Sequence, residues 1–339
     1  MKDKFDKLGL PDEHYLKIAS DSQHEYLSEL MDVLTQLKKK LTSKEFKIIW
    51  NEKLQFNKQN FREKEFIQGS CEIAVSNYFS SKENFKIEAK VNPNNKKDVD
   101  CQFTSKGFTY NIEVKCASFN AKEAVEKSDS FKFQTLGRLV NKDDLISELS
   151  KALDEGLKNQ EKPVKQHAEL KNMDNNLKEF LESANEKFNP NCPENEINIL
   201  LVGCNDPADI QSWIGYLFAT AGLFTQDSYA DVSKYKNVDL VVFTNLYYKH
   251  KDFINKQTDN FWNLSHSLNL YFENPFRTIE KRDGVDNFYT ELKNYNLEFN
   301  KFQVPGQAPI EVKEAVKTPH FVIDYLQNEQ NIYLFEKKE

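Results

Sequence analysis

Two acidic residues and a lysine stand in positions where a β-hairpin would bring them together. Asp100, Glu113 and Lys115 belong to two short stretches of alternating polar and apolar residues, which are separated by Lys106-Gly107. A two-residue hairpin turn needs positive φ angles, and glycine supplies them without strain. With this turn Asp100 lies directly opposite Glu113, and Lys115 lies two residues further along the same strand face.

Opposed carboxylates of this kind predict a bound cation. Their Cβ atoms would lie roughly 5 Å apart, and like charges so placed destabilise a sheet unless a positive group lies between them. Mg²⁺ is a hard cation that typically binds through one or two carboxylates and several waters. Lys115 would orient or help deprotonate a metal-bound water, or stabilise charge on a phosphate. The three residues therefore predict metal-dependent hydrolysis of a phosphodiester bond.

The same register sorts every residue of the hairpin onto one of two faces. The polar face holds Asp100, Gln102, Thr104, Thr109, Asn111, Glu113 and Lys115. The apolar face holds Val99, Cys101, Phe103, Phe108, Tyr110, Ile112, Val114 and Cys116. A hairpin with one solvated face would show this pattern too, but the opposed carboxylates favour a site. We expect Cys101 and Cys116 to pack in the core rather than to react.

The run of an aspartate, twelve residues and then Glu-Val-Lys resembles the PD-(D/E)XK nuclease superfamily. The resemblance implies a restriction-endonuclease-like α/β core, in which a mixed sheet is flanked by helices in the order helix, three strands, helix, strand. Candidate elements in that order are 61–79, Phe85–Val91, Val99–Thr104, Phe108–Cys116, 131–140 and Ile197–Cys204. It also implies Mg²⁺ as cofactor, which Mn²⁺ can replace, and nucleic acid as partner, with double-stranded DNA favoured.

Two further site residues follow from the resemblance alone. Many members take a metal-binding glutamate from the first helix, where Glu72 is available. Some place a glutamine on the helix after the lysine strand, where Gln134 is the candidate. Val99 stands where the proline of the motif would be, at a position that varies in the superfamily.

Asp98 is the alternative metal ligand to Asp100, although it would pair two residues away from the glutamate.

The rest of the chain predicts additions on both sides of this core. The expected regions are a helical one at 1–58, a nuclease-like core at 59–250 with a charged helical hairpin inserted at about 141–195, and an α+β addition at 251–339. Thr42 and Glu45 form a capping-box signature in the first region. In the core, a helix start at Asp206-Pro207 and a buried strand at Val238–Leu246 follow Ile197–Cys204.

Composition narrows the class of protein. Of 339 residues, 39% are hydrophobic and 29% charged, a balance typical of soluble globular proteins. No apolar run reaches the roughly 18 residues that cross a membrane, and no signal peptide is visible, so we expect a cytoplasmic protein without a membrane partner. The 5 cysteines form no CxxC pair and are expected to be reduced thiols. Motifs GxGxxG and GxxxxGK[ST] are absent, which argues against dinucleotide and P-loop chemistry.

Together these observations predict a Mg²⁺-dependent DNA endonuclease of a restriction or phage-defence kind. A homodimer would let two chains reach both strands of a duplex. The formal net charge of −7 counts little against nucleic-acid binding, because local potential matters more than the sum. The run Tyr247–Lys251 offers rings and cations for bases or phosphates. Two alternatives remain: an RNA-directed or repair exonuclease of the same fold, and a catalytically silent module for nucleic-acid binding or assembly.

Overall fold

The structure is a computed structural model, and it describes residues 9–56, 58–133, 137–160, 167–170 and 172–336. The chain divides into two compact units. The first unit consists of Met1–Cys116, Phe180–Gln211 and Ser233–Glu339, and the second consists of Ala117–Glu179 and Ser212–Val232. No helix in the described part of the chain is long and apolar enough to cross a membrane.

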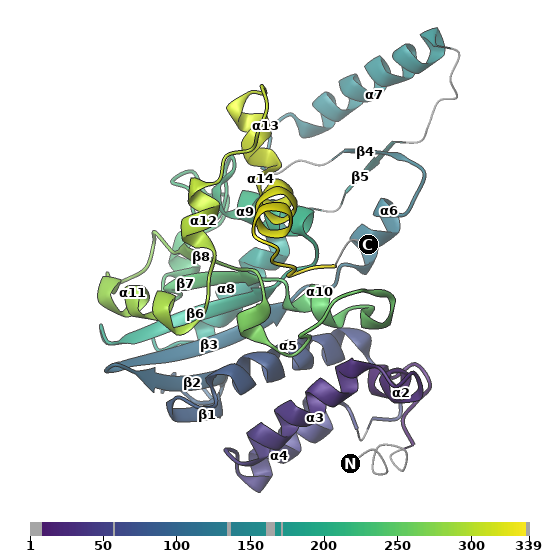
Figure 1. The fold of residues 1–339 in the computed structure, drawn as a ribbon. Helices are drawn as coiled ribbons and strands as arrows, with labels where there is room; N and C mark the ends of the chain where they lie inside the picture. The colour runs from purple at the N-terminus through teal and green to yellow at the C-terminus, as the bar shows by residue number, and fades with distance from the viewer. Residues whose placement is uncertain (1–8, 57, 134–136, 161–166, 171, 337–339) are drawn as a thin grey trace. The chain divides into compact units, whose positions relative to one another are not determined.

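A six-stranded sheet forms the centre of the first unit (Figure 1). In spatial order its strands are β1 (Glu83–Ala89), β2 (Val99–Ser105), β3 (Phe108–Cys116), β6 (Glu196–Gly203), β7 (Leu240–Thr244) and β8 (Asn269–Glu273). β2 pairs antiparallel with both β1 and β3. β3, β6 and β7 run parallel to one another, and β8 is antiparallel to β7. The protein is therefore mixed α/β with a mixed sheet, as the sequence predicts.

The hairpin of β2 and β3 has the register that the sequence predicts. Cys101 pairs with Ile112, and Ser105 pairs with Phe108 next to the turn. Both residues of the Lys106-Gly107 turn have positive φ, at 49° and 85°, as a two-residue turn of type I′ requires. The turn thus fixes which residues of the two strands face one another.

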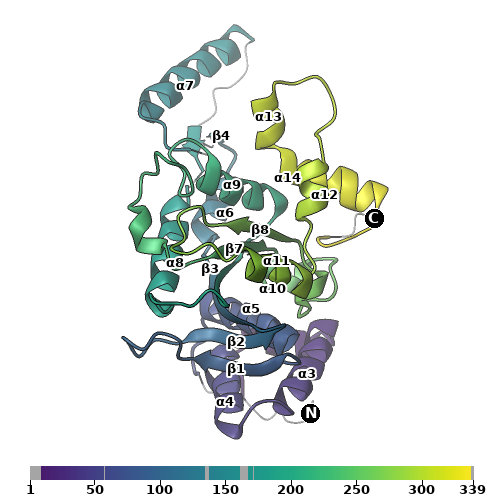
Figure 2. The ribbon, with the colours of Figure 1, turned by 90° about the vertical axis from the view of Figure 1, so that its left-hand side faces the viewer.

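Helices precede the hairpin in the chain. They are α2 (Tyr15–Asp21), α3 (Glu25–Lys38), α4 (Ser43–Ile48) and α5 (Glu63–Phe79), with the π-helical turn η1 (Ile49–Lys53) directly after α4. Thr42 and Glu45 form the predicted capping box at the start of α4. Figures 1 and 2 both show α3 and α4 at the β1 end of the sheet.

Aromatic side chains fill the space between α5 and the apolar face of the hairpin. Phe79 of α5 stacks on Phe103 of β2 with ring centroids 4.4 Å apart, and Phe103 lies 5.0 Å from Tyr110 of β3. Phe288 of α11 (Arg282–Glu291) adds a fourth ring, 5.3 Å from Tyr110. All four rings are fully buried. Burial of their apolar surface is what holds α5 against the hairpin.

The second half of the chain contains two apolar strands, β6 and β7, which are buried along almost their whole length. Helix α9 (Pro207–Phe218) starts where the sequence predicts, and Asp206 Oδ1 accepts the backbone N–H of Asp209 at 2.8 Å. The remaining elements are η2 (Val232–Tyr235), α10 (Leu246–His250), η3 (Phe253–Asn255), η4 (Leu264–His266), α12 (Asn296–Lys301), α13 (Ile310–Ala315), α14 (Lys317–His320) and η5 (Phe321–Glu329).

The insertion predicted at about 141–195 contains both expected helices, but a short strand lies between them. Before the insertion lie α6 (Asn120–Glu126) and β4 (Phe131–Phe133), and within it lie α7 (Lys142–Asn159), β5 (His167–Glu169) and α8 (Asp174–Lys187). β4 and β5 pair in parallel, so a strand separates α7 from α8. The helix expected within 131–140 is not found in the described residues of that range, where Phe131-Lys132-Phe133 forms a strand, and the helix that follows β3 is α6. Gln134 lies outside the described residues.

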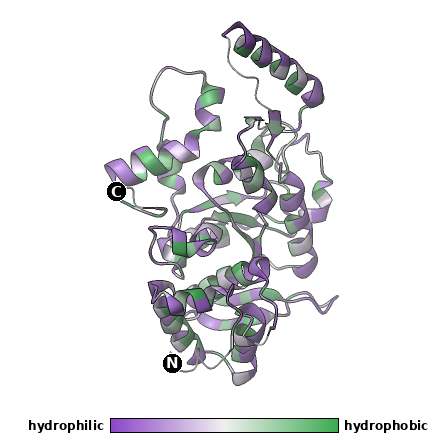
Figure 3. Cartoon of the chain, turned by 90° about the vertical axis from the view of Figure 1, so that its right-hand side faces the viewer, coloured by the Kyte–Doolittle hydropathy of each residue, from purple (hydrophilic) through white to green (hydrophobic). Residues whose placement is uncertain are grey.

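Helix α7 keeps the predicted leucine stripe, yet none of its residues is buried. Leu145 and Leu149 leave 44% and 45% of their surface exposed. Figure 3 shows hydrophobic and hydrophilic residues mixed along this helix. The stripe therefore predicted the helix correctly, but the buried packing expected of a helical hairpin is absent from this part of the described chain.

Gly69 of α5 lies against the backbone of Lys53 in η1, and its substitution tests that packing. A Cβ atom added there would lie 2.5 Å from the backbone oxygen of Lys53, nearer than real Cβ contacts. Gly69→Ala should therefore lower the free energy of unfolding by about 1–3 kcal/mol, the usual cost of overpacking. Gly156→Ala in α7 meets nothing within 4 Å and should raise it by about 0.5–1 kcal/mol. Urea denaturation measures both, and a harmless Gly69→Ala would contradict this packing.

Candidate active site

Side chains, rather than strand β2, complete the hydrogen bonds at the end of β3. The pairing of β2 with β3 runs from the turn as far as Cys101. Beyond it, the backbone N–H of Val114 donates to Asp100 Oδ2 at 2.7 Å, and its carbonyl accepts from Gln68 Nε2 at 2.8 Å. The N–H of Cys116 donates to Gln68 Oε1 at 2.7 Å. One carboxylate and one amide thus take the place of a neighbouring strand.

Gln68 also positions Glu72, which lies one helical turn further along α5. The Nε2 group of Gln68 donates to Glu72 Oε1 at 2.6 Å, a contact between residues four apart on one helix face. Burial and the charge of Asp100 raise the pKa of Glu72, while Lys53 and Gln68 act in the opposite direction. The sequence-predicted glutamate of the first helix therefore does face the hairpin carboxylate.

Lys53, the last residue of η1, lies among carboxylates from three different elements. Its Nζ atom contacts Glu72 Oε2 of α5 and lies 2.7 Å from Glu88 Oε1 of β1 and 3.7 Å from Asp100 Oδ1 of β2. Burial alone would lower the pKa of Lys53, but the three acidic neighbours outweigh it and raise that pKa well above its ordinary value. Lys53 is therefore a charged ammonium group within the site.

Glu113 is fully buried, with 0% of its surface exposed. The Nζ atoms of Lys115, on β3, and Lys187, on α8, both lie 2.7 Å from its Oε1 atom, and Lys187 donates to Oε2 at 2.8 Å. The Oε1 atom thus contacts two ammonium groups. Burial and the charge of Asp100 raise the pKa of Glu113 to about 7, against the opposing effect of the two lysines.

Seven charged residues thus gather in what we call the carboxylate–lysine cluster. Its members are Lys53, Glu72, Glu88, Asp100, Glu113, Lys115 and Lys187. Asp100, with 9% of its surface exposed, and Glu113 show that this part of the polar hairpin face is not a solvated surface. Asp98, the alternative to Asp100, precedes β2 and is only half-buried. The structure therefore places Asp100 at the end of β3.

Gln68 and three of the cluster residues were missed by reasoning from the sequence. Gln68 had a usable signal, since it stands four residues before Glu72. Glu88 follows from the register of β1, because Ile87 pairs with Cys101 and Ala89 with Val99. No pattern in the sequence indicated Lys53 or Lys187, because each reaches the site from an element distant in sequence.

The carboxylate oxygen atoms of the cluster are ligands that a hard cation prefers, whereas in this structure they contact lysine side chains. Asp100, Glu113 and Glu72 offer the carboxylate oxygens that Mg²⁺ prefers. Within the residues that the structure describes, however, no group of three or more His, Cys, Asp or Glu side chains is arranged to hold a metal ion. The contacts give the reason: ammonium groups lie against the oxygen atoms that a metal would use.

The basic and aromatic run Tyr247–Lys251 is not the nucleic-acid contact that the sequence suggested. Most of it forms α10, in which Lys249 and His250 have no exposed surface. The Nζ group of Lys249 donates to the backbone carbonyls of Asn260 at 2.9 Å and His266 at 2.5 Å. Both polar residues are therefore buried in the core. The two hydrogen bonds of Lys249 hold the segment that follows α10.

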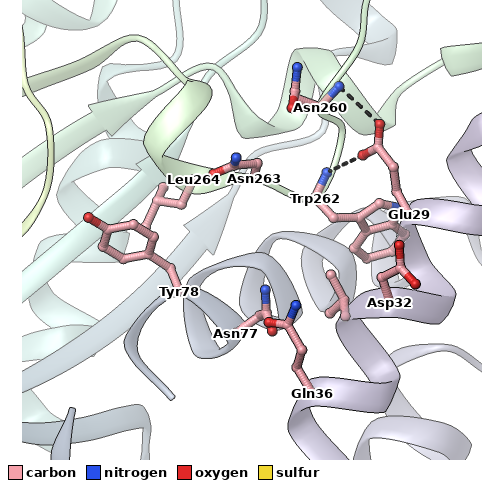
Figure 4. A pocket seen from close by; sticks show the side chains of 10 residues that line it. Glu29, Asp32, Gln36, Asn77, Tyr78, Asn260, Trp262, Asn263 and Leu264 are labelled. Carbon is pink, nitrogen blue, oxygen red and sulfur yellow. Dashed lines mark hydrogen bonds between the residues drawn. The ribbon is translucent and has the colours of Figure 1, made fainter. Parts of the chain in front are cut away.

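A separate pocket of about 340 Å³ lies elsewhere in the first unit (Figure 4). Its lining consists of Glu29, Asp32, Val33, Gln36, Asn77, Tyr78, Asn260, Trp262, Asn263 and Leu264. Glu29 accepts the backbone N–H groups of Asn260 at 3.0 Å and Trp262 at 3.3 Å, and so fixes that segment against α3. The lining includes two carboxylates and no lysine or arginine. A pocket with this charge does not suit a phosphate, which is itself negative.

Comparisons of the chain with protein-family models, with curated proteins and with solved structures gave no match. The chemistry of the carboxylate–lysine cluster is therefore the basis on which a function is inferred. That cluster combines four carboxylates with three ammonium groups at the end of a strand, a combination suited to binding a cation and an anion side by side.

The buried lysine of α10 gives a testable dependence of stability on pH. Burial lowers the pKa of Lys249 from 10.5 to about 7, so between these values the unfolded chain binds a proton that the folded chain lacks. Stability should therefore rise with pH across this window, by up to about 1.4 kcal/mol per pH unit. Lys249→Met should remove this part of the slope, whereas Lys44→Met, at an exposed position of α4, should keep it. Urea denaturation between pH 7 and 9.5 measures the slopes.

Proposed function

We propose that this chain is a metal-dependent phosphodiesterase that cleaves nucleic acid. The observation that supports it is the meeting of Asp100, Glu113 and Lys115 where the pairing of β2 with β3 ends, with Glu72 brought to the same place by α5. Gathering four carboxylates in one cluster is costly when two of them, Asp100 and Glu113, are buried, and a hairpin with a structural role alone has no need of it. Charged groups shifted in pKa and grouped in this way are typical of functional sites.

In this proposal Asp100, Glu113 and Glu72 hold Mg²⁺, or Mn²⁺ in its place. When bound, the ion polarises the phosphate and lowers the pKa of a coordinated water. Lys115 orients the attacking water, and its ammonium group stabilises the negative charge that builds up on the phosphate oxygens. Lys187 of α8 contributes a second positive charge beside Glu113.

The charges of the cluster agree with this combination of ligands. Four carboxylates face three ammonium groups, which leaves one negative charge when all seven are ionised. One divalent cation together with one phosphodiester anion would bring the sum to zero. Neither ligand alone does so, and separated charge is expensive where water is excluded. We therefore expect the metal ion and the nucleic acid to favour each other's binding.

The finer proposal is an endonuclease acting on double-stranded DNA, of a restriction or phage-defence kind, in the cytoplasm. Cleavage of both strands would need two such sites, which a homodimer supplies. RNA-directed cleavage and exonucleolytic repair use the same chemistry. Cleavage assays with plasmid, linear duplex and RNA distinguish these three activities.

A second candidate is a catalytically silent module that binds nucleic acid or assembles with it. The observation in its favour is that lysines already neutralise the carboxylates in this conformation. Such a module would keep its fold without any metal ion and would bind nucleic acid equally well in EDTA. Dependence of binding on Mg²⁺ therefore separates the two candidates.

Substitution of the three central residues tests the proposal directly. Asp100→Asn, Glu113→Gln and Lys115→Met should each reduce Mg²⁺-dependent cleavage by on the order of 100-fold or more, since each removes a ligand or a charge aimed at the reacting phosphate. Asp98→Asn, next to the site but outside β2, should cleave at a rate close to that of wild type. Plasmid, linear duplex and RNA substrates with Mg²⁺ or EDTA provide the assay.

Circular dichroism and melting curves should first establish that each variant is folded. Full cleavage by a folded Asp100→Asn variant would overturn the assignment of the site. Absence of cleavage of all substrates by the wild-type protein in Mg²⁺ and Mn²⁺, together with binding that EDTA does not change, would favour the silent module.

Glu72 comes from a different element and should tune metal binding rather than be indispensable. Glu72→Gln should raise the Mg²⁺ concentration for half-maximal cleavage roughly 10-fold, a typical effect of losing a supporting group at a metal site. Glu65→Gln is the matched control, because Glu65 lies on the same helix and pairs with Lys58 and Arg62 away from the cluster. If both variants needed the same Mg²⁺ concentration for half-maximal cleavage, Glu72 would have a structural role only.

A further inference from the structure

Lys53 differs from the other two lysines of the cluster in what it contacts. Lys115 and Lys187 both approach Glu113. Lys53 instead lies against Glu72 and Glu88 and within 3.7 Å of Asp100. Its ammonium group therefore uses oxygen atoms of two residues, Glu72 and Asp100, that a divalent cation would need.

The backbone fixes Lys53 in this place by unusual means. Lys53 ends a π-helical turn, a distortion that recurs at functional sites. Gly69 allows the Lys53 backbone to approach α5 more closely than any side chain would permit. Glu88, its partner on β1, has a φ of +48°, a left-handed conformation that is unfavourable for a residue other than glycine. An incidental surface ion pair would not require these three features.

We propose that Lys53 is a built-in competitor for the metal ion of this site. The inference rests on the proposed function, because it takes Glu72 and Asp100 as metal ligands. Without metal, the ammonium group compensates the buried carboxylates and keeps the end of β3 intact. A divalent cation binds by exchange, and the long, flexible side chain of Lys53 then turns away from Glu72 and Asp100 while its charge stays beside Glu88.

Exchange of this kind sets the metal affinity of the site. Each binding event must break the contacts of Lys53 with Glu72 and Asp100, so the wild-type protein binds metal more weakly than its ligands alone would. The compensating gain is stability in the metal-free protein, where the acids would otherwise repel one another. Metal occupancy and the position of one lysine are thereby linked.

The first test is titration of the protein with Mn²⁺ by calorimetry, which needs no substrate. Lys53→Met removes the ammonium group and keeps most of the apolar stem. It should bind Mn²⁺ on the order of 10-fold more tightly than wild type, the usual size of such a coupling, and should melt at a lower temperature in EDTA. Lys82→Met is the matched control, because Lys82 pairs with the buried Glu291 elsewhere in the unit; it should leave the Mn²⁺ affinity unchanged.

A second measurement uses the wild-type chain, so that it does not depend on a variant folding. Brief acetylation with acetic anhydride, followed by peptide mass spectrometry, reports how accessible each lysine is. Addition of Mn²⁺ should increase labelling of Lys53 several-fold while leaving Lys82 unchanged. In Asp100→Asn, which has lost a ligand, the Mn²⁺-dependent increase should be much smaller.

The outcomes distinguish this inference from the proposed function. The exchange would be wrong if wild type and Lys53→Met bound Mn²⁺ with equal affinity. It would also be wrong if Mn²⁺ bound without changing the labelling of Lys53. Either result would leave the proposal of a metal-dependent nuclease intact. Absence of Mn²⁺ binding from the wild type and every variant, together with absence of cleavage, would remove both.

Discussion

The backbone of β3 at Val114 and Cys116 imposes the constraint on which the candidate site depends. Buried N–H and C=O groups must find partners, and here the pairing with β2 has ended. Asp100 and Gln68 supply those partners, so both side chains are immobilised by a structural need. Glu72 takes its orientation from Gln68, and the position of the site thus follows from the end of a strand.

Electrostatics then decide what can occupy that position. Carboxylates withdrawn from water destabilise a fold unless cations accompany them, and each acid of the cluster has at least one lysine nearby. The sequence predicted a divalent cation between Asp100 and Glu113, and that metal ion stays a prediction. Opposed like charges nevertheless need positive charge nearby. In the structure that need is met by lysine side chains, a solution that spacing along two strands does not reveal.

Local rules predicted the parts of the fold that depend on neighbours in sequence. The hairpin register, the capping box before α4 and the start of α9 all depend on residues a few positions apart, and all were confirmed. Lys53 and Lys187 depend on tertiary contacts and could not be predicted. The same limit explains the errors: a strand intervenes between α7 and α8, and α10 buries a lysine that polarity alone would place at the surface.

The parallel pairing of β3 with β6 has a consequence for how the protein folds. Asn111 of β3 and Asn198 of β6 are hydrogen-bonded although they stand 87 positions apart. Closing so long a loop is entropically costly and slows folding. During synthesis the β2–β3 hairpin can form as soon as it emerges, but Lys187 and β6 arrive much later. Glu113 is therefore without one of its two counter-ions on the growing chain, and we expect its strand to become stable only after residues 180–203 have been made.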